Sequence, residues 1–361
     1  VVGRGPGWFS SAGALARTLG SSAIRRREET VRVIVAVWGH PCDEFADTPD
    51  LAEAMVRRLE LLHSAGVDRY FAYLAVAGKH YFESETLGPP VRDLLAPLMA
   101  AGERTGVQIH PVFGLSGESG VGLHHYKPPL EGGHVPEWAL TWSCAAWGEN
   151  HERSVLVAHE ILQRYAPAGL HLDTARYPDA STLHRQPCAC DRCLAARTRW
   201  LGKPYPEPKD LRKLGVVFKE MQMRMEFVRS FVESLRGLTD HHGASLSAGV
   251  RARYYEDALE EGQDWPEWCA EGLLDMVCPM SYALSLGGFA AQVAQHRRLL
   301  EDAPVAWVEG VGLRTPETQL DFDAFERQVR FAQDAGARGV CIADADALGE
   351  DELAVLRRVA G

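Results

Sequence analysis

Eight short runs rich in β-branched and aromatic residues alternate along this chain with runs of helical periodicity. The first strand-like run covers residues 31–38 and the last covers 339–344. Several helical runs end in a glycine two or three residues before the next strand, as at Gly66, Gly106 and Gly336. Glycine is the usual residue at a left-handed helix end, so these positions mark helix stops. Repeated strand–helix units predict an α/β protein with a parallel sheet covered by helices.

A closed barrel fits this pattern better than an open doubly wound sheet. An open nucleotide-binding sheet would carry a glycine-rich loop after its first strand, whereas this chain has Trp38, Gly39, His40 and Pro41 there. We therefore predict a single (β/α)8 TIM barrel over residues 29–361, with a cysteine-rich insertion at about 179–213. Residues 1–28, rich in Gly, Ser and Ala, are expected to form a poorly ordered extension.

The charge and hydropathy of the chain argue against two classes of partner. Its 361 residues carry a formal net charge of -11, which gives no general attraction to nucleic acid or to anionic membranes. No run approaches the roughly 20 apolar residues of a membrane span. Basic residues Arg25 to Arg27 follow the N-terminal Gly/Ser/Ala stretch, the reverse of the order in a signal peptide. A cytoplasmic location is thus slightly favoured over export, and the sequence leaves the oligomeric state open.

Asp173 is the first candidate for a catalytic residue. It interrupts an apolar strand predicted at 169–177, and TIM-barrel active sites lie where strands end. Arg176 follows closely, and a nearby guanidinium would keep the aspartate ionised, as a nucleophile requires. The alternative is that Asp173 and Arg176 form a structural pair at the strand end.

Glu309 is the candidate for a second catalytic carboxylate. It lies on the predicted seventh strand, across the barrel mouth from the fourth, and glycoside hydrolysis needs two carboxyl groups. The alternative is that Glu309 only hydrogen-bonds a loop. Four other carboxylates follow strands and compete for the second position: Glu256, Asp257, Asp344 and Asp346.

Aromatic and polar side chains accompany these acids at the predicted strand ends. Such a surface suits sugar rings, whose apolar faces stack on aromatic side chains while their hydroxyls form hydrogen bonds. The predicted substrate-binding residues are Trp38, His40, His110, Arg176, Tyr177, Tyr282, Trp307 and Asp344.

Two segments of the sequence stand out, HVPEW at 134–138 and GLHLDTARYP at 169–178. Both resemble segments of the glycosyl-hydrolase-like family ten. Members of that family carry a His-Pro-Glu-Trp-like loop and a strand of the form Gly-(Ile/Leu)-His-(Leu/Phe)-Asp-Tyr-x-Arg-(Tyr/Phe)-Pro. The strand is also similar to the fourth strand of the α-amylase clan. Both resemblances imply a barrel acting on carbohydrate, with Asp173 in the catalytic position.

The chain also departs from those patterns. Val135 is an extra residue in the loop, Thr174 replaces the usual tyrosine, and His171 replaces the arginine of the amylases. The resemblance therefore gives neither the second carboxylate nor the substrate. We predict a glycoside hydrolase acting on an oligo- or polysaccharide, with no cofactor required for catalysis. The alternatives are a non-catalytic carbohydrate-binding barrel and a metal-assisted hydrolase or lyase.

A cysteine cluster predicts a separate, structural zinc site. Cys188, Cys190 and Cys193 stand at i, i+2 and i+5, a spacing that can turn three thiolates towards one ion. Zinc requires a fourth ligand, for which we favour Cys144, with Cys42 and His184 as further options. Disulfides or reduced thiols are the alternative interpretations.

Overall fold

The computed structural model describes residues 33–361 except 46, 77, 116–120, 129–134, 182–185, 206, 208 and 211. The predicted N-terminal extension, together with His134 and His184, lies outside these described residues. Residues 33–361 form one unit.

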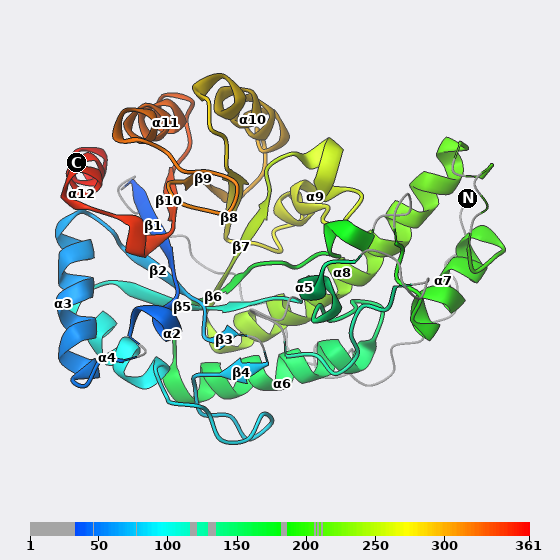
Figure 1. Ribbon diagram of the computed structural model, residues 1–361, viewed down its shortest axis with the longest axis horizontal. Helices are drawn as coiled ribbons and strands as arrows, with labels where there is room; N and C mark the ends of the chain where they lie inside the picture. Colours follow the sequence, from blue (N-terminus) through cyan, green and yellow to red (C-terminus); the bar gives the residue numbers. More distant parts are fainter. Residues whose placement is uncertain are drawn as a thin grey trace. The chain divides into compact units, whose positions relative to one another are not determined.

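Eight parallel strands close into a barrel, which confirms the predicted (β/α)8 TIM barrel (Figure 1). Each strand pairs with the next along the chain, and the last pairs with the first. The strands are β1 (Ile34–Gly39), β2 (Arg69–Ala72), β5 (Gln108–Phe113), β6 (Gly169–Leu172), β7 (Ser245–Arg251), β8 (Met276–Ser281), β9 (Ala306–Gly312) and β10 (Gly339–Ala343).

Helices that alternate with the strands cover the outside of the barrel (Figure 1). They are α3 (Leu51–Ser64), α4 (Leu95–Thr105), α6 (Gly148–Tyr165), α8 (Leu214–His242), α9 (Trp265–Ala270), α10 (Leu286–Leu299), α11 (Phe322–Asp334) and α12 (Glu350–Ala360). None of these described helices is long and apolar enough to cross a membrane.

Several shorter helices and one β-hairpin lie in the loops between these strands and helices. They are α2 (Pro41–Glu44), the hairpin β3 (Ala75–Val76) and β4 (Lys79–His80), α5 (Glu137–Leu140), η1 (Asp179–Ser181), α7 (Asp191–Leu201), η2 (Tyr254–Ala258) and η3 (Ala345–Ala347). Helix α7 belongs to the cysteine-rich insertion and lies beside α8 (Figure 1).

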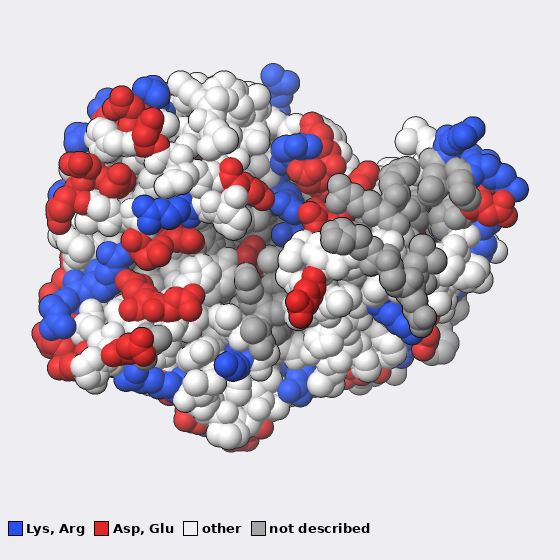
Figure 2. All heavy atoms as spheres, viewed as in Figure 1, with Lys and Arg blue, Asp and Glu red and all other residues white. Residues whose placement is uncertain are grey.

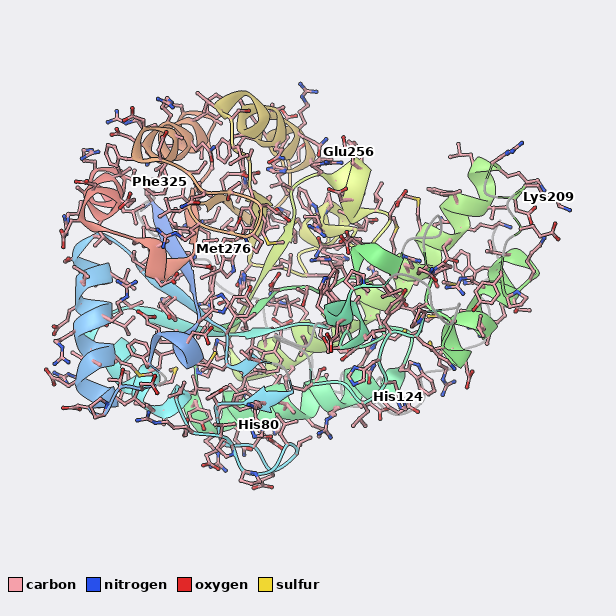
Figure 3. All side chains as sticks on the ribbon, in the orientation of Figure 1. His80, His124, Lys209, Glu256, Met276 and Phe325 are labelled. Atoms are coloured by element: carbon pink, nitrogen blue, oxygen red, sulfur yellow. The ribbon has the colours of Figure 1, made fainter. Side chains whose placement is uncertain are left out.

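The alternation of side chains along each strand separates the barrel interior from the layer beneath the helices. The interior cluster comprises Ile34, Ala36, Trp38, Phe71, Tyr73, Val112, Met276, Cys278, Val308, Cys341 and Ala343. Met276, labelled in Figure 3, belongs to this cluster, whereas the labelled Phe325 of α11 is buried in the larger core outside it. This separation decides which strand residues can reach the barrel mouth.

Two strands end earlier than the sequence predicts. The run at 68–76 splits into β2 and the first strand of the β3–β4 hairpin. The run at 169–177 is extended only as far as Leu172, because Thr174 adopts a left-handed conformation with φ 56°. Asp173 consequently lies at the first turn after the strand, which is where a barrel presents functional groups.

Candidate active site

Asp173 lies at the mouth of the barrel, and both oxygens of its carboxylate accept hydrogen bonds. The Tyr73 hydroxyl donates a hydrogen bond to Oδ2 at 2.6 Å, and the Thr174 backbone N–H donates one to Oδ1 at 2.7 Å. The Asp173 N–H donates to the Phe113 carbonyl at 2.8 Å, which ties the turn to β5. Because both carboxylate oxygens accept hydrogen bonds, Asp173 is arranged as a base or nucleophile rather than as a proton donor.

Aromatic rings and a neutral histidine form the floor beneath this carboxylate. The Trp38 indole N–H donates to His171 Nε2 at 3.0 Å, and His171 Nδ1 lies 2.8 Å from Ser247 Oγ. Phe71 stacks on the imidazole with ring centroids 3.8 Å apart. Burial lowers the pKa of His171 well below 6.5, so the ring stays neutral and its Nε2 can accept the hydrogen bond from the indole N–H.

Gly249 of β7 leaves room beside Asp173. A Cβ atom at this position would lie 3.3 Å from His171 Nε2, 3.4 Å from Trp38 Cζ2 and 3.6 Å from Asp173 Oδ1. Any side chain longer than a methyl group would therefore extend into the space next to the carboxylate. The absence of a side chain keeps the floor of the mouth open.

Tyr282 lines the mouth on the β8 side. Its ring meets the edge of Trp38 with centroids 6.5 Å apart and an interplanar angle of 89°. Burial, followed by the negative charge of Asp173, raises the pKa of the Tyr282 hydroxyl well above 10. Trp38 and Tyr282, two predicted substrate-binding residues, thus lie together near Asp173.

A second carboxylate approaches the mouth from the end of β10. His40 stacks on Tyr73 with ring centroids 4.5 Å apart and an interplanar angle of 6°. His40 Nε2 lies 3.6 Å from Asp344 Oδ1, and the two side chains are 34% and 33% exposed. Asp344 is therefore connected to Asp173 through His40 and Tyr73, and is accessible from solvent.

A hollow of about 400 Å³ opens beside this pair of residues. It is lined by His40, Asp43, Glu44, Val76, Asp344 and Asp346. Figure 2 shows acidic side chains gathered on this face, over α2 and the η3 segment. The hollow offers carboxylates and an imidazole to a polar ligand.

The structure does not bring Glu309 to the barrel mouth. Val308 faces the barrel interior, so Glu309 points outward to the helices and is completely buried there. Its Oε2 accepts a hydrogen bond from the Trp307 indole at 2.7 Å and lies 3.0 Å from His296 Nδ1 of α10. The prediction that Glu309 faces Asp173 therefore needs correction, and we give Glu309 no catalytic role.

The buried pair of His296 and Glu309 predicts a pH-dependent stability. Burial lowers the pKa of His296, but attraction to the Glu309 carboxylate and hydrogen bonds outweigh burial and raise the pKa above 6.5. The stabilisation is thus complete below pH 6.5 and is lost as the pH rises through the folded-state pKa. In urea unfolding, His296→Gln should lower the free energy of unfolding more at pH 6 than at pH 9.

The exposed His63 of α3 provides the control for this measurement. His63→Gln should change the free energy of unfolding by a few tenths of a kcal/mol, on the order of other surface substitutions, at both pH values. An equal or larger loss for His296→Gln at pH 9 would contradict the assignment of a charged, paired imidazole.

Arg176 and Tyr177 point away from Asp173. The Arg176 guanidinium donates to Glu261 Oε2 at 2.9 Å and lies over the Trp142 ring, 4.9 Å from its centroid. The expected pairing of Arg176 with Asp173 is therefore wrong, because the turn after β6 sends the guanidinium towards a different carboxylate. The Tyr177 hydroxyl lies 3.7 Å from Cys193 Sγ, at the cysteine cluster.

The remaining predicted substrate-binding residues also lie away from the mouth. Trp307 packs on the outer wall of the barrel beside Glu309. His110 lies inside the barrel, 1% exposed, and neither ring nitrogen has a hydrogen-bond partner within the described part of the chain. Burial, followed by the charge of Arg69, lowers the pKa of His110 to about 3.

The competing carboxylates after β7 are solvated. Glu256 is exposed on η2, near the outer edge of the view in Figure 3. Asp257 Oδ2 lies 3.3 Å from Arg253 Nε in a surface pair. These positions agree with the interpretation of both residues as loop charges.

Two residues of the mouth, Tyr73 and Gly249, are not among the predicted site residues. Tyr73 shares with Phe71 the inward phase of the second predicted strand, and Gly249 is a glycine inside a strand, which often marks close approach to a ligand. Both signals were present in the sequence, but neither residue is itself a typical catalytic group.

The predicted zinc ligands come together in a compact group. The sulfur atoms of Cys144, Cys188, Cys190 and Cys193 all lie within 4.8 Å of one another, and all four residues are buried. No disulfide joins these four cysteines in the structure. The cluster joins the loop after β5 to the insertion after β6.

Comparisons with known proteins give the fold of the chain but not its family. No family model matches the chain, and no curated protein matches its sequence. The structure is similar to that of the PgaB (BpsB) glycoside hydrolase domain from Bordetella bronchiseptica, with a TM-score of 0.71 and 15% identity over 91% of this chain and 99% of that one.

Two further solved structures share the fold. One is the catalytic domain of beta-amylase from Paenibacillus polymyxa, with a TM-score of 0.60 and 12% identity over 89% of this chain and 94% of that one. The other is a GH18 chitinase from Cycas revoluta in complex with (GlcNAc)3, with a TM-score of 0.52 and 12% identity over 91% of this chain and 98% of that one. At such identities the likeness shows a shared barrel, on which function must be argued from the site.

Proposed function

We propose that this barrel is a glycoside hydrolase that uses Asp173 and Asp344 as its two carboxylates. The observation that carries the proposal is the connection across the mouth: Asp173 accepts from Tyr73, Tyr73 stacks on His40, and His40 approaches Asp344. Glycoside hydrolysis requires one carboxyl group to donate a proton and a second to act as base or nucleophile. The two aspartates have different surroundings, because Asp173 is held by hydrogen bonds within the protein whereas Asp344 is open to solvent.

Asp173 takes the role of base or nucleophile in this scheme. Both of its oxygens accept hydrogen bonds within the protein, and only 8% of the residue is exposed. A carboxylate fixed in this way can attack a sugar carbon or activate a water without first rotating. The partly exposed Tyr282 would hold the sugar ring by its apolar face, with the buried Trp38 packed edge-on against it.

Asp344, beside His40, takes the role of proton donor to the leaving group. It is one-third exposed and lines the hollow, so that a glycosidic oxygen can approach it from solvent. The proposal is supported by the fold, which also occurs in a glycoside hydrolase domain, a beta-amylase and a chitinase. Turnover is tested by the release of reducing ends from a panel of oligo- and polysaccharides that starts with GlcNAc oligomers.

Substitution of Asp344 tests its role as proton donor separately from the role of Asp173. Asp344→Ala should reduce turnover of an oligosaccharide by about 10²–10⁴-fold, the usual contribution of general acid catalysis. Turnover of an aryl glycoside with a dinitrophenolate leaving group should fall much less, because that group needs no protonation to leave. Steady-state rates on both substrates give the comparison.

The control is Asp302→Asn, in the exposed loop between α10 and β9 at the opposite end of the barrel. This variant should keep the wild-type rate on both substrates. An equal loss on both substrates for Asp344→Ala would contradict its role as proton donor. Binding of oligosaccharides without any release of reducing ends would instead support a non-catalytic carbohydrate-binding barrel.

A further inference from the structure

Four cysteines from two loops surround one point in the protein interior. Cys144 Sγ lies 3.5 Å from Cys193 Sγ, 3.6 Å from Cys190 Sγ and 3.8 Å from Cys188 Sγ. A zinc ion bound by four thiolates at about 2.3 Å in a tetrahedron sets its sulfur atoms about 3.8 Å apart. We propose that these four cysteines bind one structural zinc ion, independently of the proposed catalysis.

The separations distinguish a shared centre from disulfide bonds. Bonded sulfur atoms in a disulfide are about 2.05 Å apart, so the 3.5–3.8 Å contacts match thiols around a common centre rather than two bridged pairs. Four sulfur ligands close the coordination shell of zinc and leave no position for water or substrate. The site is therefore structural.

The start of α7 is arranged to stabilise negative sulfur atoms. Cys190 is the N-terminal capping residue of this 11-residue helix, and its sulfur accepts a hydrogen bond from the Cys193 backbone N–H at 3.5 Å. Backbone N–H groups at a helix start carry partial positive charge and stabilise thiolates. Cys190 and Cys193 are therefore placed where thiolates are favoured.

Buried positive charge next to the cluster provides an independent argument. Arg197 and Arg224 are each 1% exposed, and both pair with a single buried carboxylate, Glu220. Arg197 Nη2 also donates to the Cys188 carbonyl at 2.7 Å. Two guanidinium groups and one carboxylate leave an excess positive charge, whereas a zinc ion with four thiolates carries two negative charges. The surroundings thus match the metal-bound cluster better than four neutral thiols.

Zinc at this site would join two loops that begin at neighbouring strands. Cys144 follows β5, and the other three ligands follow β6, the strand that leads into Asp173. The loops already touch at Trp142, whose indole N–H donates to the Arg176 carbonyl at 2.8 Å. Binding is a ligand exchange in which the four thiols release their protons to solvent and no electrons are transferred.

The experiment is elemental analysis of the purified full chain, combined with cobalt substitution. We expect one zinc per chain in the wild type and loss of that zinc in Cys193→Ser. Cobalt titrated into the demetallated wild type should saturate at one ion per chain, with the intense visible absorption of tetrahedral thiolate coordination. Cys269→Ser provides the matched control, because Cys269 is also buried but lies in α9, outside the cluster.

Several outcomes would overturn the proposal. They are a zinc content near zero with all eight thiols titratable in denaturant, fewer than eight titratable thiols in the unreduced chain after unfolding with a chelator, and iron in place of zinc. The cobalt titration uses the wild-type chain, so it decides the question even when Cys193→Ser does not fold. Wild-type cobalt binding without thiolate absorption would also reject the site.

Discussion

Asp173→Asn will reduce turnover by about 10³-fold or more while leaving the barrel folded. The substitution keeps the size of the side chain and its acceptor oxygen for one of the two hydrogen bonds from Tyr73 and Thr174. It removes the negative charge that a base or nucleophile requires, and catalysis by such a group contributes about 10²–10⁴-fold or more. The measurement is kcat on any glycan that the wild type cleaves, with circular dichroism and the melting temperature as checks on the fold.

A graded control strengthens this test. Tyr73→Phe removes one of the two hydrogen bonds that orient the carboxylate but leaves its charge, so it should lose turnover by a smaller factor, about tenfold. The control variant Asp302→Asn should keep the wild-type turnover. A fully active Asp173→Asn would refute the assignment, since no step of the proposed chemistry proceeds without this charge.

Glu220→Ala will be among the most destabilising single substitutions in the described part of the chain. The Glu220 carboxylate accepts from Arg197 Nε at 3.0 and 3.1 Å and from Arg224 Nε at 3.3 Å, with all three side chains at most 2% exposed. Its removal leaves two guanidinium groups buried without their carboxylate, which costs about 3–5 kcal/mol. The free energy of unfolding is measured in urea.

The same helix provides the control for Glu220. Glu233 pairs with Arg229 at 2.8 Å, also four residues apart on α8, but these side chains are 48% and 34% exposed. Glu233→Gln should cost at most about 0.5 kcal/mol, because solvent screens the pair and hydrates either side chain alone. Losses of similar size for the two variants would show that burial does not decide the strength of these pairs.

The fold could be predicted from the sequence because its evidence is spread over the whole chain. Eight strand-like runs and a series of glycine helix stops indicate a barrel even where single boundaries are wrong. The boundary errors have local causes. The strand predicted at 169–177 ends at Leu172 because Thr174 adopts a left-handed conformation that threonine seldom takes.

The catalytic partner of Asp173 could not be predicted, because barrel strands are buried on both faces. Along β9, Val308 faces the interior while Trp307 and Glu309 face the helices, and apolar residues occupy both sides. Without an alternation of polar and apolar residues, the sequence does not show which face of a strand points inward. The sequence-based prediction for Glu309 is therefore wrong about the face of the strand on which its side chain lies.

The orientation of the Arg176 side chain could not be predicted from the sequence either. It stands three positions after Asp173, and the turn that the chain forms after Leu172 directs its guanidinium to another carboxylate. Its partner, Glu261, is 85 residues away along the chain. The cysteines are different: the close spacing of three of them predicts a shared centre, and the structure brings Cys144 to them.

The depth of the barrel mouth depends on the single residue at position 249, which is glycine in this chain. A methyl group there would lie 3.3 Å from His171 Nε2 and 3.6 Å from Asp173 Oδ1, and a larger side chain would fill the space between the barrel floor and an incoming sugar. Homologues that carry alanine or serine at this position would have a shallower mouth on an unchanged scaffold. Position 249 is thus where natural variation or laboratory selection can alter which rings enter without rebuilding any loop.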